Sequence, residues 1–222
     1  MLYPPRISDD SKYEPEEGVI KFDLRHRTTP PVVHPLLGEL NAWREILFTL
    51  GLTGQDPKRY GGLGYGNVSI RESRTRFLIS GSQTGGIAEL QAKHYVRVLN
   101  ADIPGNRIES EGPCHPSSET MSHAAAYAAA DEIQCVFHVH HPQIWQAASD
   151  LGIAQTPPGI PYGTIGMADC ISTLLKTRSC EVIAMKGHED GLIAVGRTLK
   201  DAGTSILDLL AKAKAMRLNN AE

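Results

Sequence analysis

Three histidines, His138, His140 and His188, are the residues of this sequence with the clearest capacity for chemistry. His138 and His140 are separated by one residue at the end of an apolar run that is expected to be a strand, so both side chains project from the same face and can converge on one ion. His188 follows a second apolar run, and ligands at the ends of neighbouring strands build a three-histidine site with an open position. The alternative is that the paired histidines are solvated or hydrogen-bonded side chains.

Glu119 is a candidate carboxylate, because it follows Ser117 and Ser118 at the start of an alanine-rich segment. An acidic residue in the first turn of a helix is favourable to the helix dipole, and this structural role would explain Glu119 on its own. His123 lies four residues further along, on the same helical face. It is an alternative metal ligand or a hydrogen-bond partner, or a histidine with a purely structural role.

Glycine and hydroxyl residues gather in three turns, residues 64–67, residues 80–86 and the pair Ser117–Ser118. Backbone N–H groups exposed by glycine, together with Ser and Thr hydroxyls, can bind an anion without a cationic side chain. Each segment alone is simply a turn. The phosphate-loop and dinucleotide-binding patterns are absent from the sequence, as is a serine nucleophile elbow.

Composition indicates an ordinary globular protein. The chain has 222 residues, 41% hydrophobic and 21% charged, with a formal net charge of -3, so there is no bulk positive charge to attract nucleic acid. No run reaches the roughly 18 apolar residues of a membrane span, and the start lacks the apolar region of a signal peptide, so we expect a cytoplasmic protein. Four widely spaced cysteines are expected to be reduced thiols: Cys114, Cys135, Cys170 and Cys180.

Hydrophobic periodicity then predicts the elements that position these residues. Residues 1–33 are rich in proline and charge and are expected to form an extended arm laid on the body or on a partner subunit. The expected helices are residues 36–50, ending at Gly51, and residues 87–93, 119–130, 142–149, 168–175 and 199–216. The expected strands are residues 67–71 and 76–80, which form a hairpin, and residues 95–99, 107–110, 133–140, 181–185 and 192–195.

A hairpin followed by alternating helices and strands predicts a single α/β domain over residues 34–222. Its central β-sheet is mixed, and helices cover both faces in an α/β/α arrangement.

Six segments in this order resemble the class II aldolase/adducin family, most closely its fuculose-phosphate aldolase branch. They are GNVSIR, FLISGSQTGG, HPSSE, HVHH, PYGTIG and KGHEDGLIAVG. The resemblance covers about residues 36–210. It implies an α/β/α domain, a cyclic homotetramer, and a divalent metal in clefts between subunits. Zinc is the metal we expect, with manganese, cobalt and iron as alternatives.

The resemblance also implies roles for individual residues. The three metal ligands fall on His138, His140 and His188, and the base, which is also a metal ligand when substrate is absent, falls on Glu119. A tyrosine acid matches Tyr162, which could equally be an aromatic packed beside Pro161. The phosphate-binding positions match Asn67, Thr84, Gly85, Ser117 and Ser118.

Two departures from the family pattern bear on the substrate. The loop at residues 80–86 is longer than usual, and Glu189 and Asp190 separate His188 from the following glycine. These carboxylates could orient an imidazole or change which substrates the cleft admits.

The implied activity is that of a metal-dependent lyase, which makes or breaks a carbon–carbon bond in a small hydroxycarbonyl or sugar-phosphate substrate through a metal-stabilised enediolate. A dehydratase, a decarboxylase or an epimerase using the same site is the first alternative, although the epimerase pattern has Asp where this chain has Glu119. The second alternative is a non-catalytic interaction module of the adducin type, which has no need of the histidines.

Overall fold

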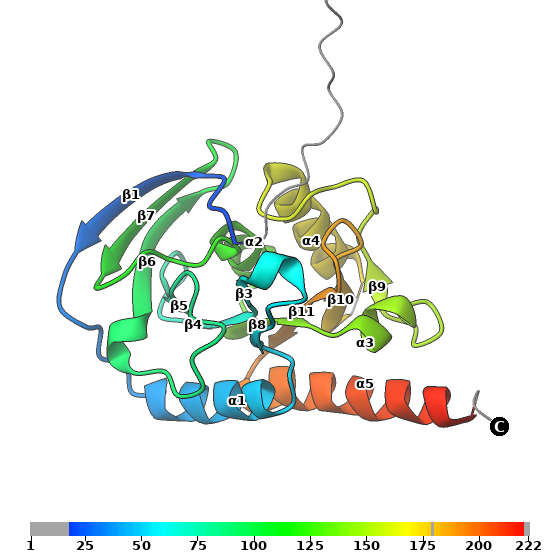
Figure 1. Cartoon of the computed structure of the whole chain (residues 1–222). Coiled ribbons are helices and arrows are strands. Elements are labelled where there is room, and N and C mark those ends of the chain that lie inside the picture. The colour runs from blue at the N-terminus through cyan, green and yellow to red at the C-terminus, as the bar shows by residue number, and fades with distance from the viewer. Residues whose placement is uncertain (1–17, 179, 220–222) are drawn as a thin grey trace, which may run out of the picture.

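A computed structural model describes residues 18–178 and 180–219 of the chain. Its centre is a nine-stranded sheet whose order is β1-β7-β6-β5-β4-β8-β11-β10-β9 (Figure 1). In that order the strands are Asp23–Thr28, Arg107–Gly112, Tyr95–Asp102, Phe77–Ser80, Asn67–Arg71, Cys135–His140, Gly191–Gly196, Val182–Ala184 and Ala154–Gln155. A separate pair of short strands is formed by β2 (Gly54–Gln55) and β3 (Gly64–Tyr65).

Helices cover both faces of the large sheet. The helices α1 (Leu37–Thr49) and α5 (Leu199–Asn219) lie along one face, and α2 (Thr120–Ala129) and α4 (Ile165–Thr177) cover the other (Figure 1). The pairs β1–β7 and β9–β10 are parallel and the remaining pairs are antiparallel, so the sheet is mixed. The predicted fold class is confirmed.

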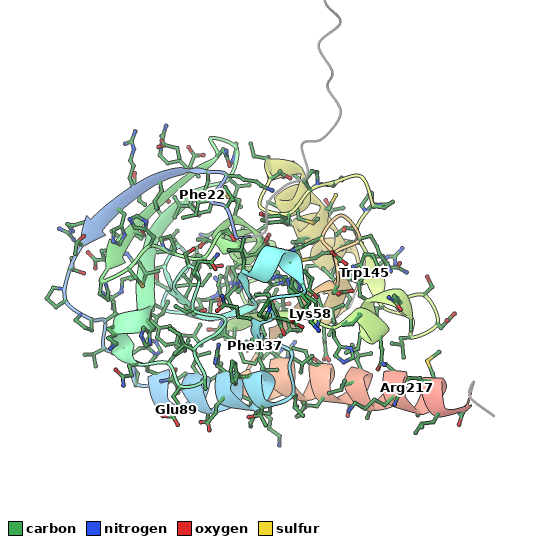
Figure 2. All side chains as sticks on the ribbon, viewed as in Figure 1. Phe22, Lys58, Glu89, Phe137, Trp145 and Arg217 are labelled. Atoms are coloured by element: carbon green, nitrogen blue, oxygen red, sulfur yellow. The ribbon has the colours of Figure 1, made fainter. Side chains whose placement is uncertain are left out.

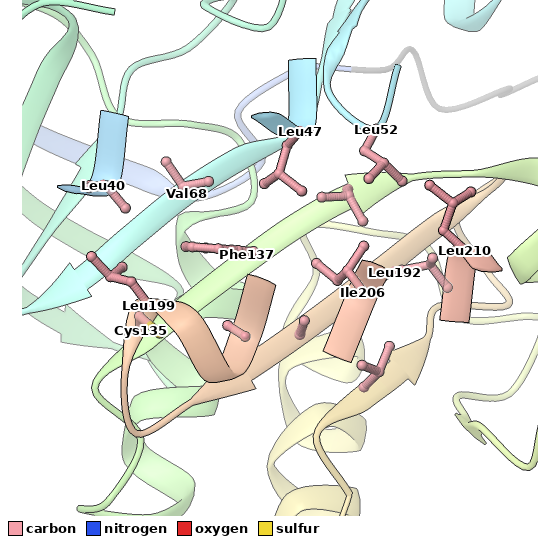
Figure 3. Packing of buried hydrophobic residues seen from close by; sticks show 14 of the residues in the cluster. Leu40, Leu47, Leu52, Val68, Cys135, Phe137, Leu192, Leu199, Ile206 and Leu210 are labelled. Carbon is pink, nitrogen blue, oxygen red and sulfur yellow. The ribbon is translucent and has the colours of Figure 1, made fainter. Parts of the chain in front are cut away.

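Two hydrophobic cores fill the spaces between the sheet and its helices. The first joins Leu40 and Leu47 of α1 and Ile206 of α5 to Val68 and Phe137 of the central strands, as Figure 3 shows from close by. The second packs α2 and α4 on the opposite face. Because side chains alternate along a strand, β5, β8 and β11 each contribute apolar residues to both cores.

Helix α1 follows the predicted apolar spacing. Leu40 and Leu47 are buried, and the chain leaves the helix through Gly51, whose φ is 70°. Glycine adopts this left-handed conformation without the steric cost of a side chain, so the predicted glycine stop is confirmed. The helix also buries Arg44, one turn after Leu40.

The helix predicted over residues 87–93 is wrong. The structure has a loop there, with a short 3₁₀ turn at Ala92–His94. The carbonyls that a helix would use internally are bound from α1, since Arg44 donates to the Ala88 oxygen at 2.8 Å and Asn41 donates to the Leu90 oxygen at 3.0 Å. Side chains of a neighbouring helix therefore replace the helical hydrogen bonds.

Strand β1 was not predicted, because it lies within the segment expected to be an arm. Its burial alternates only weakly, and it pairs in parallel with β7 at the edge of the sheet. His26 fixes it there, since its ring nitrogens lie 3.0 Å from Ser110 Oγ and 3.1 Å from the Gly112 oxygen. Residues 1–17 of the expected arm lie outside the described residues.

The other predicted elements are present, several of them longer than expected. Helix α3 (Pro142–Gln146) begins at its proline but ends before the expected position at Ser149. The strands β2, β3 and β9 were not predicted, because two residues show no periodicity. All four cysteines are free.

Figure 2 shows Phe137 in the interior and the charged residues Glu89 and Arg217 at the periphery. Within residues 18–178 and 180–219, no helix is long and apolar enough to cross a lipid bilayer.

Phe137→Ala should destabilise the fold strongly, because this side chain is fully buried between β8 and the α1–α5 layer. We expect the free energy of unfolding, measured by urea denaturation, to fall by about 3–5 kcal/mol. Val33→Ala is the control, because Val33 is 88% exposed, and it should change the value by less than about 0.5 kcal/mol. Similar losses in both variants would contradict this assignment of the core.

Candidate metal centre and active site

Strand β8 presents its histidines and its apolar residues on opposite faces. Phe137 and Val139 point into the core beneath α1 and α5, whereas His138 and His140 alternate with them and lie on the α2 side. Both imidazoles are buried, and their Nε2 atoms lie 3.0 Å apart. The structure thus brings the two predicted ligands together on one face.

His188 reaches the same place by a route that differs from the expected one. The strand before it, β10, does not neighbour β8, because β11 lies between them. His188 instead belongs to the turn that enters β11, and β11 pairs with β8 so that Gly191 is opposite His140. The His188 ring stacks on His138 with centroids 5.0 Å apart and meets His140 edge-on at 4.7 Å.

Gly191 leaves the room that these rings need. A Cβ at this position would lie 3.0 Å from His188 Cγ and 3.3 Å from His138 Cε1. Both contacts are with ring atoms that the site holds in place, so a side chain would push the two imidazoles apart. The close approach of the backbone is what allows one ligand atom from each histidine to lie within 4.8 Å of the others.

The chemistry of this donor set fits a divalent ion. Burial, and next the neighbouring His188 and His138, lower the pKa of His140 well below its ordinary value, which favours the neutral imidazole that binds metals. His138 Nδ1 lies 3.0 Å from the Leu192 oxygen. Nδ1–H donation from His138 to Leu192 leaves its Nε2 lone pair facing the other histidines.

Glu119 adds a buried carboxylate to this donor set. It directly precedes α2, as predicted, and its side chain is 2% exposed. Ser122 donates to Oε2 at 2.7 Å, while Oε1 lies 3.7 Å from His188 Nδ1 and accepts no hydrogen bond from the residues that the structure describes. A buried carboxylate oxygen beside three imidazoles is suited to a metal or to a substrate proton.

His123 belongs to a different cluster. Its Nδ1 lies 2.7 Å from Ser69 Oγ, which is also 2.7 Å from the hydroxyl of Tyr127. Burial, followed by the nearby His138, lowers the pKa of His123 well below its ordinary value. The structure therefore favours the hydrogen-bonded role for His123, one turn away from Glu119.

The five predicted phosphate positions line one pocket together with Glu119 and His138. They come from the start of β4, the loop after β5 and the turn before α2. The predicted positions supply hydroxyl, amide and backbone groups, and they are Asn67, Thr84, Gly85, Ser117 and Ser118. Gly18 also lines the pocket, and no Lys or Arg is among the described residues that do so. The glycine and hydroxyl turns that looked independent in the sequence thus form a single site.

Arg44 supplies positive charge from behind this loop and was not predicted from the sequence. The buried guanidinium donates to the carbonyl oxygens of Gly85, Ala88 and Thr84 at 2.5, 2.8 and 3.1 Å. Burial lowers the pKa of Arg44 to about 10, so it remains a cation at neutral pH. The available signal was a charged residue on the apolar face of a predicted helix, between Leu40 and Leu47.

Tyr162 is both packed in the core and in contact with a predicted ligand. It is 2% exposed, and its ring stacks on His188 with centroids 4.5 Å apart. Lys21, which was also not predicted, places its ammonium 3.5 Å from the Tyr162 ring centroid and donates to the Tyr162 carbonyl. The two interpretations of Tyr162 are thus compatible in space.

Comparisons with known proteins agree with this geometry. The model of the Class II Aldolase and Adducin N-terminal domain matches residues 57–215. L-fuculose-1-phosphate aldolase from Thermus thermophilus has a similar structure, with a TM-score of 0.64 and 19% identity over 84% of this chain and 94% of that one. YgbL from Klebsiella pneumoniae, described as an aldolase, epimerase or decarboxylase, has a TM-score of 0.62 and 18% identity over 83% of this chain and 90% of that one.

A sugar-phosphate aldolase from Thermotoga maritima is similar as well, with a TM-score of 0.62 and 16% identity over 82% of this chain and 94% of that one. No curated protein matches the sequence. The mixed sheet between two helical layers is the fold of the class II aldolases. This chain belongs to the class II aldolase/adducin family.

The histidine triad predicts about one divalent ion per chain, because this donor set suits zinc and its neighbours. Elemental analysis should find the ion in the wild type, and the metal content should fall severely in His138→Ala and His188→Ala. Gly191→Ala should also lose metal, since its Cβ would separate His188 from His138.

His123→Asn is the matched control, because His123 is equally buried but bonds to Ser69. It should retain the ion. Metal loss in His123→Asn equal to that in His138→Ala would make His123 a ligand, and full occupancy in all variants would eliminate the site.

Proposed function

We propose that this protein is a divalent-metal-dependent lyase of the aldolase type, acting on a small hydroxycarbonyl substrate that carries an anionic group such as phosphate. The observation that carries the proposal is the single pocket in which Glu119 and His138 meet a loop of neutral hydrogen-bond donors. Neighbouring structures described as fuculose-phosphate and sugar-phosphate aldolases support the same substrate class.

His138, His140 and His188 would hold the metal, with Glu119 as a further ligand when no substrate is present. Zinc suits these donors, and manganese, cobalt and iron are the alternatives. A divalent ion bound there acts as a Lewis acid on the carbonyl and hydroxyl oxygens of the substrate.

Glu119 is the proposed base. Its Oε2 is fixed by Ser122, and its Oε1 accepts no hydrogen bond within the described part of the chain, so one oxygen is held still while the other can take a proton. The turn before α2 orients it further, because Ser117 Oγ accepts the Glu119 backbone N–H at 3.2 Å. Proton transfer by a positioned carboxylate needs this kind of constraint.

The anionic group of the substrate would lie against the hydroxyl and amide lining: Asn67, Thr84, Gly85, Ser117 and Ser118. Arg44 favours an anion there, because its charge is bonded to the carbonyl side of the same loop. Tyr162, stacked on His188, is the proposed acid that protonates the departing oxygen.

A dehydratase, decarboxylase or epimerase would use the same pocket, and the description of YgbL names two of these reactions for that protein. A panel of hydroxycarbonyl substrates, assayed with and without chelator, separates them by product. An adducin-type module without catalysis is disfavoured by the intact set of three histidines and Glu119. We also propose a cytoplasmic homotetramer whose site lies in a cleft between subunits, which sedimentation analysis would test.

Glu119→Gln should lower turnover by about 10²–10⁴-fold, because the amide cannot take up the substrate proton. Exchange of that proton with deuterated solvent, followed by NMR, should slow by a similar factor. A Glu119→Gln protein that retains metal and exchanges the proton at the wild-type rate would show that the base is elsewhere.

Ser118→Ala should change a different kinetic constant from Glu119→Gln. If Ser118 contacts the anionic group in both the ground and transition states, its loss raises KM more than it lowers kcat. Steady-state kinetics with a phosphorylated substrate and its dephosphorylated analogue would measure the split. An unchanged preference for the phosphorylated substrate would place the anion away from Ser118.

A Schiff-base mechanism would require a nucleophilic lysine, and Lys186 is the candidate closest to His188 in the sequence. Its ammonium instead donates to the Trp145 carbonyl and lies 4.2 Å from the Trp145 ring centroid. Borohydride added with substrate should therefore trap no adduct, and thorough chelation should abolish activity. A trapped adduct or activity that survives chelation would overturn the proposal.

A further inference from the structure

Two acidic residues, Glu189 and Asp190, separate His188 from Gly191, and the structure gives them different surroundings. Glu189 is exposed, whereas Asp190 is 6% exposed. The Asp190 carboxylate accepts a hydrogen bond from the Tyr60 hydroxyl at 2.7 Å and forms an ion pair with Arg59 Nη2 at 3.0 Å. Asp190 is therefore held by residues that lie about 130 positions earlier in the chain.

Tyr60 in turn contacts the proposed metal centre. Its ring meets His140 edge-on with centroids 4.7 Å apart, and it packs on Tyr65, which also faces His140 at 5.4 Å. His140 is thus in contact with four rings, those of Tyr60, Tyr65, His138 and His188. The orientation of its imidazole depends on where these rings are held.

The backbone shows that this arrangement is tightly constrained. Tyr60 has φ of 51° and Asp190 has φ of 58°, a left-handed conformation that non-glycine residues seldom adopt. Such a conformation is unfavourable for a residue with a side chain, so the surrounding structure must over-determine both. The hydrogen bond that joins Tyr60 to Asp190 connects the two strained positions directly.

Charge gives Asp190 a second effect. The Arg59 guanidinium carbon lies 4.7 Å from the Tyr60 ring centroid and 5.7 Å from the Tyr65 ring centroid, and both rings contact His140. A guanidinium this close to the site disfavours a divalent cation. Asp190 is the carboxylate paired with Arg59, with its side chain 8% exposed, so it offsets this repulsion at short range.

We propose that Asp190 and Tyr60 are positioning residues for His140: Asp190 fixes the Tyr60 ring against the imidazole and neutralises Arg59, and both effects raise the affinity of the site for a divalent metal. This inference rests on the proposed metal site. It concerns residues that would not touch the metal or the substrate.

The first test compares two neighbouring carboxylates. Asp190→Asn and Glu189→Gln each remove one negative charge beside His188, but it is Asp190 that binds Tyr60 and Arg59. Zinc affinity, measured by competition with a chromogenic chelator, should fall about 10–100-fold in Asp190→Asn and by less than about threefold in Glu189→Gln. Equal losses in the two variants would reduce the effect to overall charge and overturn the inference.

The second test compares two hydroxyls on the tyrosine rings that contact His140. Tyr60→Phe removes the hydroxyl bonded to Asp190, and Tyr65→Phe removes one that bonds the Gly51 carbonyl at 3.4 Å. Tyr60→Phe should weaken zinc binding about tenfold and change the visible spectrum of the cobalt-substituted protein, whereas Tyr65→Phe should change neither. Wild-type affinity and spectrum in Tyr60→Phe would overturn the inference.

Failure of the inference is distinguishable from failure of the proposed function. If the wild type binds no zinc or cobalt, the metal site itself is refuted. If the wild type binds metal and Asp190→Asn and Tyr60→Phe bind it equally well, the positioning role alone is refuted. Apo-protein melting curves check that each variant is folded at the temperature of the metal titrations.

Discussion

Strand β8 is buried on both faces, and each face has a different requirement. On one side Phe137 and Val139 must be apolar, because helices α1 and α5 close over them. On the other side His138 and His140 are buried polar residues: His138 Nδ1 bonds to the Leu192 oxygen, the two Nε2 atoms lie 3.0 Å apart, and Gly191 leaves space for the rings. The strict alternation of side chains in a strand joins the two requirements. A slip of one residue in the pairing of β8 would exchange core and site.

Buried charge around the pocket is anchored in a similar way at each position. Arg44 donates to three carbonyls of residues 84–88, Asp190 is paired with Arg59, and one oxygen of Glu119 accepts from Ser122. Each charged group is held by a neighbour, so little rearrangement is needed when a ligand arrives. Preorganised polar groups of this kind stabilise charge more effectively than water, which must reorient.

The sequence predicted the fold class, most elements and the meeting of His138, His140, His188 and Glu119, because each depends on local periodicity or on an ordered set of motifs. It could not predict that β11 would lie between β8 and β10, since strand order depends on packing between distant segments. The wrong helix at residues 87–93 has a similar cause, because side chains of α1 bind its carbonyls. Arg44, Lys21 and Tyr60 were not predicted because their roles arise only from contacts with residues far along the chain.

The segment that carries Lys21 and β1 has a consequence for the order in which the protein folds. Lys21 donates its ammonium to the carbonyl of Tyr162, 141 positions later, and its own carbonyl accepts from Asn106 at 2.9 Å. Closing such long loops costs chain entropy before the contacts compensate for it, so pairings this distant form slowly. We therefore expect the wall of the pocket that contains Tyr162 to be among the last parts of the molecule to reach its native geometry, after the β4–β5 hairpin and the helices have formed.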